Sequence, residues 1–255
     1  MTACAASIQA IGDAARLIRN DEADMALCGG SEATIDKVAL GSFAAAKAVK
    51  THCDSEPAKA SRPFDLARDG FVMAEGAGLL VLEALDHALA RGAKPLVEVV
   101  GYGTSADAYR VTSGPEDGSS AARSMRAALR QARLQPHDIQ HLNAHATSTL
   151  VGDRGELAAI RQVFGAGSGP SITTTKSAMG HMLGAAGAAA AIFTILALRD
   201  QIAPHVLNLQ HPDPLADGLD LIAGSARAHA IEHAMLNGFG FGGVNASLVL
   251  KRFSA

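Results

Sequence analysis

Hydrophobic and polar positions alternate along the chain with two periods, one typical of helices and one of strands. Just after Cys4, apolar residues recur at three- and four-residue steps with charged residues between them: Ile8, Ile11, Ala15 and Ile18. This spacing predicts an amphipathic helix. The same reasoning predicts helices at residues 4–21, 35–49, 85–91, 119–133, 153–164 and 183–200, and strands at residues 25–28, 71–74, 78–83, 96–102, 139–143, 171–174, 203–207, 219–222, 235–239 and 246–251.

Turn residues separate these segments and suggest how they connect. Glycines lie between the strands at 71–74 and 78–83, so we expect those two strands to pair with each other. The stretches 51–61 and 106–120 are predicted loops, and Ser119 or Ser120 is expected to cap the helix that follows. Alternating strands and helices over 255 residues predict an α/β fold, with helices covering largely buried sheets.

Two pieces of this order occur twice. The ends of the first and the Ala-rich helices are similar, and residues 71–82 align without gaps on residues 239–250. We infer a duplicated α/β unit, with one half at residues 1–94 and the other at residues 95–255. The second half has strands and helices before its Ala-rich helix, whereas nothing precedes Cys4 in the first. We therefore expect the first half to be incomplete, with exposed sheet edges and apolar faces.

Composition narrows the classes of function. Hydrophobic residues make up 48% and charged residues 18% of the chain, which is typical of a globular protein. The 22 basic and 25 acidic residues form no Lys/Arg cluster, so nucleic acid is not an expected partner. The apolar run Leu183–Leu198 is short for a membrane span, so no membrane association is expected. The N-terminus lacks the pattern of a secretory signal, which favours a cytoplasmic protein.

Neither the cysteines nor the histidines predict a metal site. Cys4, Cys28 and Cys53 are an odd number without C-x-x-C spacing, which argues against disulfides and zinc. Histidines recur at four-residue steps at positions 137, 141 and 145, as on a metal-binding helix. Pro136 and the predicted strand at 139–143 would send these side chains in different directions, so no metal is expected.

Four short stretches could carry chemistry. Cys4 lies at a helix start, where free N–H groups and the helix dipole favour a thiolate nucleophile. His145 follows a strand end, and a turn carrying Lys176 and His181 precedes the Ala-rich helix as the counterpart of the Cys4 turn. The glycine-rich stretch 238–243 could present N–H groups to an oxyanion. Taken alone, Cys4 is better explained by packing under a helix start, His145 is equally explained as a structural histidine in a loop, and each glycine is explained by a tight turn before the last strand.

Together these stretches resemble a known family. The sequences Thr-Ala-Cys-Ala, Asn-Ala-His-x-Thr-Ser-Thr, Lys-Ser-x-x-Gly-His-x-Leu-Gly-Ala-Ala-Gly and Gly-Phe-Gly-Gly-x-Asn occur here in the order seen in β-ketoacyl-acyl-carrier-protein synthases. The segments 62–65 and 69–78 fit the same pattern. The resemblance covers essentially the whole chain and is strongest to the type II elongating enzymes of bacterial fatty-acid synthesis.

The resemblance implies a fold, a reaction and partners. It implies the thiolase-like fold, a five-layered α/β arrangement of two similar halves, in a homodimer. The reaction is a decarboxylating Claisen condensation between an acyl-cysteine thioester and malonyl-acyl carrier protein. The partners would be acyl carrier protein and its acyl and malonyl thioesters. No resident cofactor is implied, because phosphopantetheine arrives on the acyl carrier protein.

The resemblance also assigns roles to residues. Cys4 would accept the acyl chain, while His145 and His181 would support decarboxylation and stabilise the enolate, with Lys176 in the same catalytic set. Phe241 would gate the acyl pocket, and its N–H group would share the oxyanion hole with that of Cys4. Two threonines, Thr147 and Thr149, would bind the phosphopantetheine arm, and Phe239 joins them as a substrate-binding residue.

The chain departs from the family pattern in places. Ala190 stands where the family usually has glutamate, which leaves the partner of Lys176 open, and Ala146, Leu150 and Val244 are milder changes. A substantial segment that the family carries before the cysteine motif is absent. Two alternatives therefore remain, a non-catalytic truncated or partner subunit and a polyketide- or initiation-type condensing enzyme. Acyl chain length is not predicted.

Overall fold

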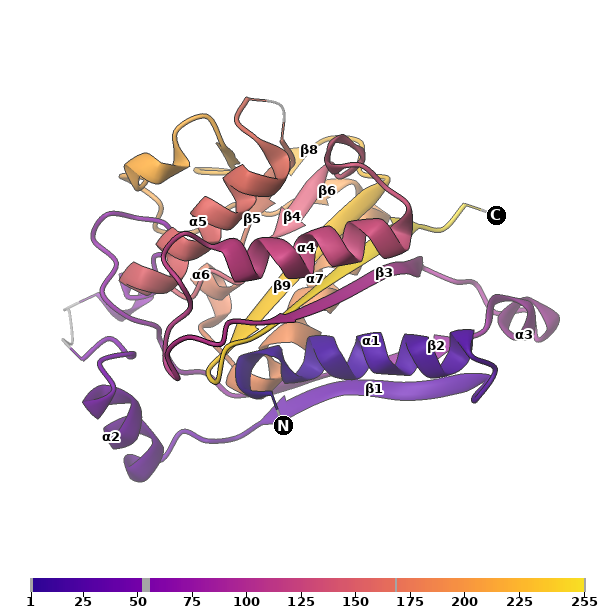
Figure 1. Cartoon of the computed structure of the whole chain (residues 1–255), viewed down its shortest axis with the longest axis horizontal. Helices are drawn as coiled ribbons and strands as arrows, with labels where there is room; N and C mark the ends of the chain where they lie inside the picture. Colours follow the sequence, from indigo (N-terminus) through magenta and orange to yellow (C-terminus); the bar gives the residue numbers. More distant parts are fainter. Residues whose placement is uncertain (1, 52–55, 168, 255) are drawn as a thin grey trace.

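The fold is built around a mixed six-stranded sheet (Figure 1). The computed structural model describes residues 2–51, 56–167 and 169–254. The strand order is β3 (Val97–Ala106), β10 (Val244–Arg252), β9 (His233–Gly240), β4 (His141–Asn143), β5 (Ser171–Thr173) and β7 (Asp220–Leu221). Strand β10 is antiparallel to both β3 and β9, whereas β9 pairs with β4, β4 with β5 and β5 with β7 in parallel.

Helices cover both faces of this sheet. On one face, α4 (Ser119–Ala132) and α5 (Leu150–Phe164) pack on alternate strand residues, including Met235 and Val249. On the other face, α1 (Ala6–Arg19) and α7 (Ala186–Asp200) pack on the residues between them, including Leu236 and Leu248. Because successive strand side chains point to opposite faces, each strand contributes to two separate cores. The sheet is therefore buried on both sides, as the sequence predicts.

A second sheet lies beyond α1 and α7. It consists of β1 (Met25–Glu32) and β2 (Gly76–Glu83), paired antiparallel over their whole length, and Figure 1 shows β1 on the far side of α1 from the central sheet. Its inner face packs on the two helices. Its outer face exposes apolar side chains, with Leu27 70% and Leu79 and Val81 each 59% accessible. The predicted exposed apolar face is thus confirmed on this sheet.

The remaining elements are short. Three further helices are α2 (Lys37–Ala45), α3 (Leu85–Ala90) and α6 (Lys176–Met179). Strands β6 (Ile202–Ala203) and β8 (Arg227–Ala228) pair with each other. Single 3₁₀ turns occupy Ala3–Ala5, Pro57–Lys59, Pro136–Asp138, Leu183–Ala185 and Pro214–Ala216.

Several sequence predictions are wrong in detail. The strands predicted at 71–74 and 78–83 do not pair; β2 pairs with β1, and residues 71–74 form only isolated bridges, to Val49 and His181. The backbone N–H and C=O groups of residues 71–74 hydrogen-bond to neighbouring loops, so these residues form no strand ladder with residues 78–83. The helix predicted at 35–49 begins only after Asp36, whose side chain caps α2, and the strands predicted at 203–207 and 219–222 shrink to two residues each. Part of the predicted loop at 51–61 lies outside the described residues.

The start of α4 also differs from the prediction. Its N-cap is Gly118, with φ of +68°, rather than Ser119 or Ser120. A side chain at position 118 would lie 2.2 Å from the carbonyl oxygen of Gly155 in α5. Close packing of α4 on α5 therefore selects glycine at this position and overrides the serine preference for caps.

The two helices that flank the site begin in the same way. Both α1 and α7 follow a 3₁₀ turn, and the first residue of each turn has a positive φ, +47° at Ala3 and +44° at Leu183. The second residue is Cys4 in one turn and Gly184 in the other. The backbone N–H of Gly184 donates a hydrogen bond of 3.1 Å to the Glu32 carboxylate at the end of β1.

The apolar segment Leu183–Asp200 is long and apolar enough to cross a membrane by length and composition. In the structure, however, 61% of it is buried, because it lies between the central sheet and the β1–β2 sheet. Its surroundings are those of a core helix.

The buried His141 predicts how stability depends on pH. Burial, together with the nearby His229, lowers the pKa of His141 from 6.5 to about 3, so the native state keeps it neutral. The unfolded chain binds a proton there below about pH 6.5, so the free energy of unfolding should fall as pH drops from 6.5 toward 3, by up to about 1.4 kcal/mol per pH unit. Urea unfolding of the chain and of His141→Gln measures this. The variant should show the shallower slope between pH 6 and pH 4, and equal slopes would contradict the assignment.

Candidate active site

The α1 and α7 turns bring Cys4 and His181 together. Cys4 is 8% exposed, and its Sγ atom lies 3.0 Å from Nε2 of His181. The two turns are held to each other by Ser7, whose hydroxyl donates to the carbonyl of Gly184 at 2.7 Å and accepts from the N–H of Ala188 at 2.9 Å. The convergence predicted from the repeat is therefore what the structure shows.

The protonation of Cys4 differs from the prediction. Burial raises the pKa of the Cys4 thiol to about 11, even though Lys176 and the backbone N–H groups of Phe241 and Cys4 itself lower it. The expectation that the helix start favours a thiolate is wrong at rest, because desolvation of the charged form outweighs these stabilising groups. The resting residue is a thiol, with His181 within reach of its proton.

Both histidines in the site are neutral. Burial, followed by the charge of Lys176, lowers the pKa of His181 and of His145 well below 6.5. The two imidazole rings lie 5.4 Å apart at an interplanar angle of 85°. Neutral imidazoles can each donate one hydrogen bond without bringing a positive charge into the cavity.

Glu156 fixes the loop that carries His145. Its carboxylate accepts the backbone N–H groups of His145 and Ala146, at 2.8 and 2.6 Å, and the side-chain amide of Asn237 at 3.0 Å. Glu156 is also the acid with the largest effect on Lys176, whose pKa burial lowers to about 8. The charge that most favours protonated Lys176 is therefore that of Glu156 on helix α5, while Ala190 belongs to the apolar core between α7 and the central sheet.

The glycine-rich stretch comes close to the cysteine. A side chain at Gly240 would lie 2.4 Å from the carbonyl oxygen of Thr2 and 3.2 Å from the nitrogen of Cys4, so only glycine lets the end of β9 approach the Cys4 turn. This approach brings the N–H of Phe241 to the Cys4 sulfur. The backbone N–H groups of Phe241 and Cys4 thus both favour negative charge at this sulfur.

A cavity of about 360 Å³ leads to this group of residues. Seven of the eight predicted site residues line it: Cys4, His145, Thr147, Thr149, His181, Phe239 and Phe241. The eighth, Lys176, is buried and influences Cys4 and both histidines through its charge. The Thr147 and Thr149 hydroxyls lie 3.2 Å apart on the cavity wall.

Aromatic rings form an apolar side of the cavity. Phe43 of α2 contacts Phe71 edge-on, with ring centroids 5.4 Å apart, and contacts Phe241 at 6.2 Å. Phe71 in turn packs against the ring of His181 at 5.1 Å. An acyl chain next to Cys4 would find an apolar surface here.

The histidines spaced by four do not converge. The side chain of His137 is 78% exposed, His141 is bonded to Ser171 and Thr173 inside the sheet, and His145 faces the cavity. Across the described ranges, no group of three or more His, Cys, Asp or Glu side chains is placed to hold a metal ion. Of the cysteines, Cys4 and Cys28 are both free thiols.

Sequence reasoning misses several residues around the site. Glu156 lies in the middle of a helix, where an acid is usually solvent-exposed. Asp107 accepts a hydrogen bond of 2.6 Å from Asn245 at the cavity wall. Arg68 and Asp153 form part of a buried ion cluster, and burial raises the pKa of Asp153 to about 7. The close spacing of Asp153 and Glu156 on α5, just after the threonine motif, is the one signal that could have pointed to them.

Comparison with known proteins agrees with this geometry. Residues 1–88 match the model of the β-ketoacyl synthase N-terminal domain, and residues 96–210 match that of the β-ketoacyl synthase C-terminal domain. The chain therefore belongs to the β-ketoacyl synthase family, the class that its fold and its Cys–His–His site define.

Within the family, curated relatives have a more specific name. The chain is 51% identical to 3-oxoacyl-[acyl-carrier-protein] synthase 2 of Rhizobium meliloti, over 100% of this chain and 60% of that protein. It is 48% identical to the mitochondrial 3-oxoacyl-[acyl-carrier-protein] synthase of Arabidopsis thaliana, over 98% and 55%. The chain thus spans about 60% of the length of the curated relatives it matches.

Solved structures confirm the fold. A β-ketoacyl synthase from Burkholderia phymatum superposes with a TM-score of 0.94 at 41% identity, covering 99% of this chain and 60% of that one. A ketosynthase complex described as a type II polyketide acyl-carrier protein with its ketosynthase bound to the hexaketide reaches 0.96 at 37% identity, covering 99% and 62%. The predicted α/β, thiolase-like fold is confirmed.

The burial of Cys4 predicts how it reacts with a small reagent. Because its pKa is about 11, alkylation by iodoacetamide should rise about tenfold per pH unit between pH 7 and pH 10. Lys176→Met should slow the reaction further, about tenfold at pH 7, since it removes the charge that favours the thiolate. The difference should shrink above pH 8, where Lys176 itself loses its proton.

Mass spectrometry of the Cys4 peptide measures the rate. Lys59→Met is the matched control, because Lys59 is an exposed lysine paired with Glu56. Equal rates for Lys176→Met and the control at pH 7 would show that Lys176 does not act on the sulfur.

Proposed function

We propose that this chain carries the catalytic residues of an elongating 3-oxoacyl-[acyl-carrier-protein] synthase. The reaction is the decarboxylating Claisen condensation of an acyl-cysteine thioester with malonyl-acyl carrier protein, giving 3-oxoacyl-acyl carrier protein. The observation that carries the proposal is the 3.0 Å contact between the Cys4 sulfur and His181 at the end of a cavity lined by His145. Relatives named 3-oxoacyl-[acyl-carrier-protein] synthase, up to 51% identical, support it.

The first step transfers the acyl chain to Cys4. The sulfur attacks the thioester carbonyl of the acyl carrier protein substrate, and Nε2 of His181 accepts the thiol proton. The oxyanion of the tetrahedral intermediate lies against the N–H groups of Cys4 and Phe241. The carbon–sulfur bond to the phosphopantetheine arm then breaks, and the departing thiolate recovers the proton. The thiol form of Cys4 is sufficient, because its base lies within hydrogen-bond distance.

The second step forms the carbon–carbon bond. The malonyl group loses its carboxylate as carbon dioxide, and the electron pair remains on its α-carbon as an enolate. Neutral His145 and His181 stabilise the enolate oxygen as hydrogen-bond donors, and His181 does so after its ring proton moves from Nδ1 to Nε2, the nitrogen that accepted the thiol proton in the first step. The α-carbon attacks the acyl-Cys4 carbonyl, the bond to sulfur breaks, and Cys4 takes up a proton. Burial, followed by the charge of Lys176, lowers the pKa of both imidazoles and keeps them neutral, which favours this arrangement.

Substrate delivery follows from the cavity. We propose that the partner is acyl carrier protein, whose phosphopantetheine arm contacts Thr147 and Thr149, with Phe239 beside His145 at a ring distance of 5.6 Å and Phe241 as the gate of the acyl pocket. No resident cofactor or metal takes part in this scheme. One neighbouring structure is a ketosynthase in complex with its acyl-carrier protein, which supports such a partner.

We also propose a cytoplasmic homodimer. The free thiols of Cys4 and Cys28 suit a reducing compartment. The exposed apolar side chains of α2, with Val38 78% accessible, lie beside the cavity wall formed by Phe43 and suit a subunit contact. Light scattering on the purified protein tests the dimer.

A polyketide-type condensation is the second candidate, because the neighbour described as bound to a hexaketide superposes at a TM-score of 0.96. The two reactions share every step at Cys4 and differ in whether the 3-oxo product is reduced before the next addition. Incubation with malonyl-acyl carrier protein alone, followed by mass analysis, separates them. Repeated addition to a poly-3-oxo chain would favour the polyketide reading.

Paired variants test the catalytic assignment in the full open reading frame that encodes this chain. Cys4→Ala should abolish both the acyl-enzyme adduct and condensation, by about a thousandfold or more, because the nucleophile is removed. His145→Ala should retain the adduct but lose condensation, because His181 rather than His145 contacts the sulfur. Intact-mass spectrometry measures the adduct, and a 3-oxoacyl product assay measures condensation.

The inert alternative makes the opposite prediction. A non-catalytic partner subunit would give no acyl mass on Cys4 with the wild-type sequence. Condensation by Cys4→Ala at the wild-type rate would overturn the proposed role of the cysteine.

A further inference from the structure

We propose that Arg68 is a positioning residue for the substrate-binding threonines. It holds the turn Thr147–Thr149 in a strained conformation through a buried ion cluster with Asp153 and Asp213, so that both hydroxyls face the cavity. The inference rests on the proposed function, in which these hydroxyls contact the phosphopantetheine arm. Its consequence is that Arg68 governs the affinity for carrier-bound substrates without acting on the chemistry at Cys4.

The turn between the threonines is strained. Ser148 has φ of +72°, a left-handed conformation that is costly for a residue with a Cβ atom, and its side chain is fully buried. Such a conformation persists only where the surroundings enforce it. At Ser148 each polar group is bonded: its N–H donates to Asp153 at 3.1 Å, its hydroxyl accepts from the Arg62 N–H at 3.1 Å, and its carbonyl accepts from the Gly70 N–H at 2.9 Å.

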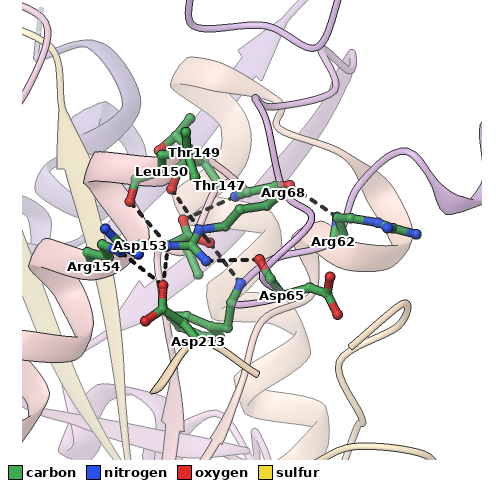
Figure 2. Close-up of polar contacts among 12 residues, drawn as sticks. Arg62, Asp65, Arg68, Thr147, Thr149, Leu150, Asp153, Arg154 and Asp213 are labelled. Atoms are coloured by element: carbon green, nitrogen blue, oxygen red, sulfur yellow. Dashed lines mark hydrogen bonds and ion pairs between the residues drawn. The ribbon is translucent and has the colours of Figure 1, made fainter. Parts of the chain in front are cut away.

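Arg68 holds the other end of the turn. Figure 2 shows its side chain reaching across to the backbone of the first turn of α5, where Nε donates to the Thr149 carbonyl at 3.1 Å and Nη2 to the Leu150 carbonyl at 3.2 Å. The planar guanidinium presents these donors in a fixed fork, whereas an ammonium group would have to reach both carbonyls from one nitrogen on a flexible stem. The same contacts fix the backbone from which the Thr149 side chain projects.

Buried acids hold the guanidinium itself in place. Nη2 donates to Asp213 at 2.9 Å, and Asp153 lies 3.6 Å from Nε, with the side chains of Arg68 and Asp153 fully buried. A buried charge is costly unless it is paired and hydrogen-bonded, so these contacts favour the observed position of the guanidinium. Asp153 links the ion cluster to the strained turn. One of its carboxylate oxygens accepts a hydrogen bond from the Ser148 N–H, and the other accepts one from the Phe64 N–H at 2.8 Å.

The threonine hydroxyls lie in the cavity wall and bond to each other, while the hydroxyl of Thr149 makes no bond to the helix. Thr149 occupies the N-cap position of α5, yet its side chain makes no capping hydrogen bond. Its hydroxyl lies 3.2 Å from that of Thr147 in the cavity wall. An N-cap threonine ordinarily uses its hydroxyl on the helix. Here the Arg68 cluster orders the turn from behind, so both hydroxyls remain available in the cavity.

The contacts of Arg68 within the described chain go to residues 65, 149, 150, 153 and 213, and none goes to Cys4 or His181. A disturbance at Arg68 should therefore change binding of the arm more than reactivity of the thiol. This separation gives the test a readout that general destabilisation would not reproduce.

Arg68→Lys is the first test, in the full open reading frame. Lysine keeps the charge but cannot hold two carbonyls and Asp213 together, so KM for malonyl-acyl carrier protein should rise about tenfold while kcat changes less than about threefold. The rate of Cys4 alkylation by iodoacetamide should stay as in the wild type. Arg154→Gln is the matched control, because Arg154 contacts the same Asp213 oxygen at 3.0 Å from a 53% exposed position; its KM should not change.

Gly152→Ala tests the same hydroxyls from the other side. A methyl group there would lie 2.5 Å from Oγ1 of Thr149 without touching the ion cluster, so this variant should raise KM in the same way even if Arg68→Lys does not fold. When Arg68→Lys or Gly152→Ala is combined with Thr149→Val, KM of the double variant should rise by less than the two single effects together, since each change acts through the Thr149 hydroxyl.

The outcomes separate the two proposals. An unchanged KM in Arg68→Lys, or a loss of kcat and of Cys4 alkylation with KM unchanged, would overturn the positioning role. If Arg68→Lys does not fold, an unchanged KM in Gly152→Ala would overturn it. A wild-type protein that forms no acyl-enzyme and no product would instead overturn the proposed function.

Discussion

The packing of helix α1 against helix α7 is the interaction on which the site depends. A side chain at Gly187 would lie 2.5 Å from Ile8, so the helices touch only because α7 has glycine at that point. Ser7 then ties the start of α1 to both Gly184 and Ala188. The central sheet and the β1–β2 sheet enclose the pair. With both helix starts fixed in this way, Cys4 and His181 have no freedom to separate.

Burying charged side chains beside the site costs solvation energy, and nearby charges of opposite sign offset part of that cost. Lys176 is buried with Glu156, and Arg68 with Asp153 and Asp213, while the two histidines and the cysteine stay neutral. Desolvation disfavours an isolated charge at these buried positions, so the buried charged side chains lie close to charges of opposite sign. The reactive groups Cys4, His145 and His181 are therefore neutral, which suits a reaction in which charge develops only transiently.

Much of this arrangement could be predicted from the sequence. The long periodic helices, the α/β class and the meeting of Cys4 with His181 through the repeat are predicted correctly, because each depends on local periodicity or on internal similarity. The predicted pairing of strand 71–74 with strand 78–83 is wrong, because the backbone of residues 71–74 bonds to the loops at Val49 and His181 instead. The local sequence pattern does not reveal these distant partners. The predicted thiolate form of Cys4 is wrong because burial raises its pKa, and that burial comes from elements distant from Cys4 in the sequence. The sequence does not predict the roles of Glu156 and Arg68, because the residues around a charged side chain in the sequence do not show whether it is buried or solvent-exposed.

The 3₁₀ turns before α1 and α7 have similar backbones but different hydrogen-bond partners, because Glu32 bonds to only one of the two. In one turn the N–H of Cys4 faces the reactive sulfur, whereas in the other the equivalent N–H of Gly184 is occupied by the Glu32 carboxylate. Two turns of similar backbone therefore have different surroundings. The carboxylate bonded to Gly184 joins the end of β1 to the start of α7, whereas the Cys4 turn lines the cavity. In the proposed reaction, the Cys4 turn is the one of the pair that meets the substrate carbonyl.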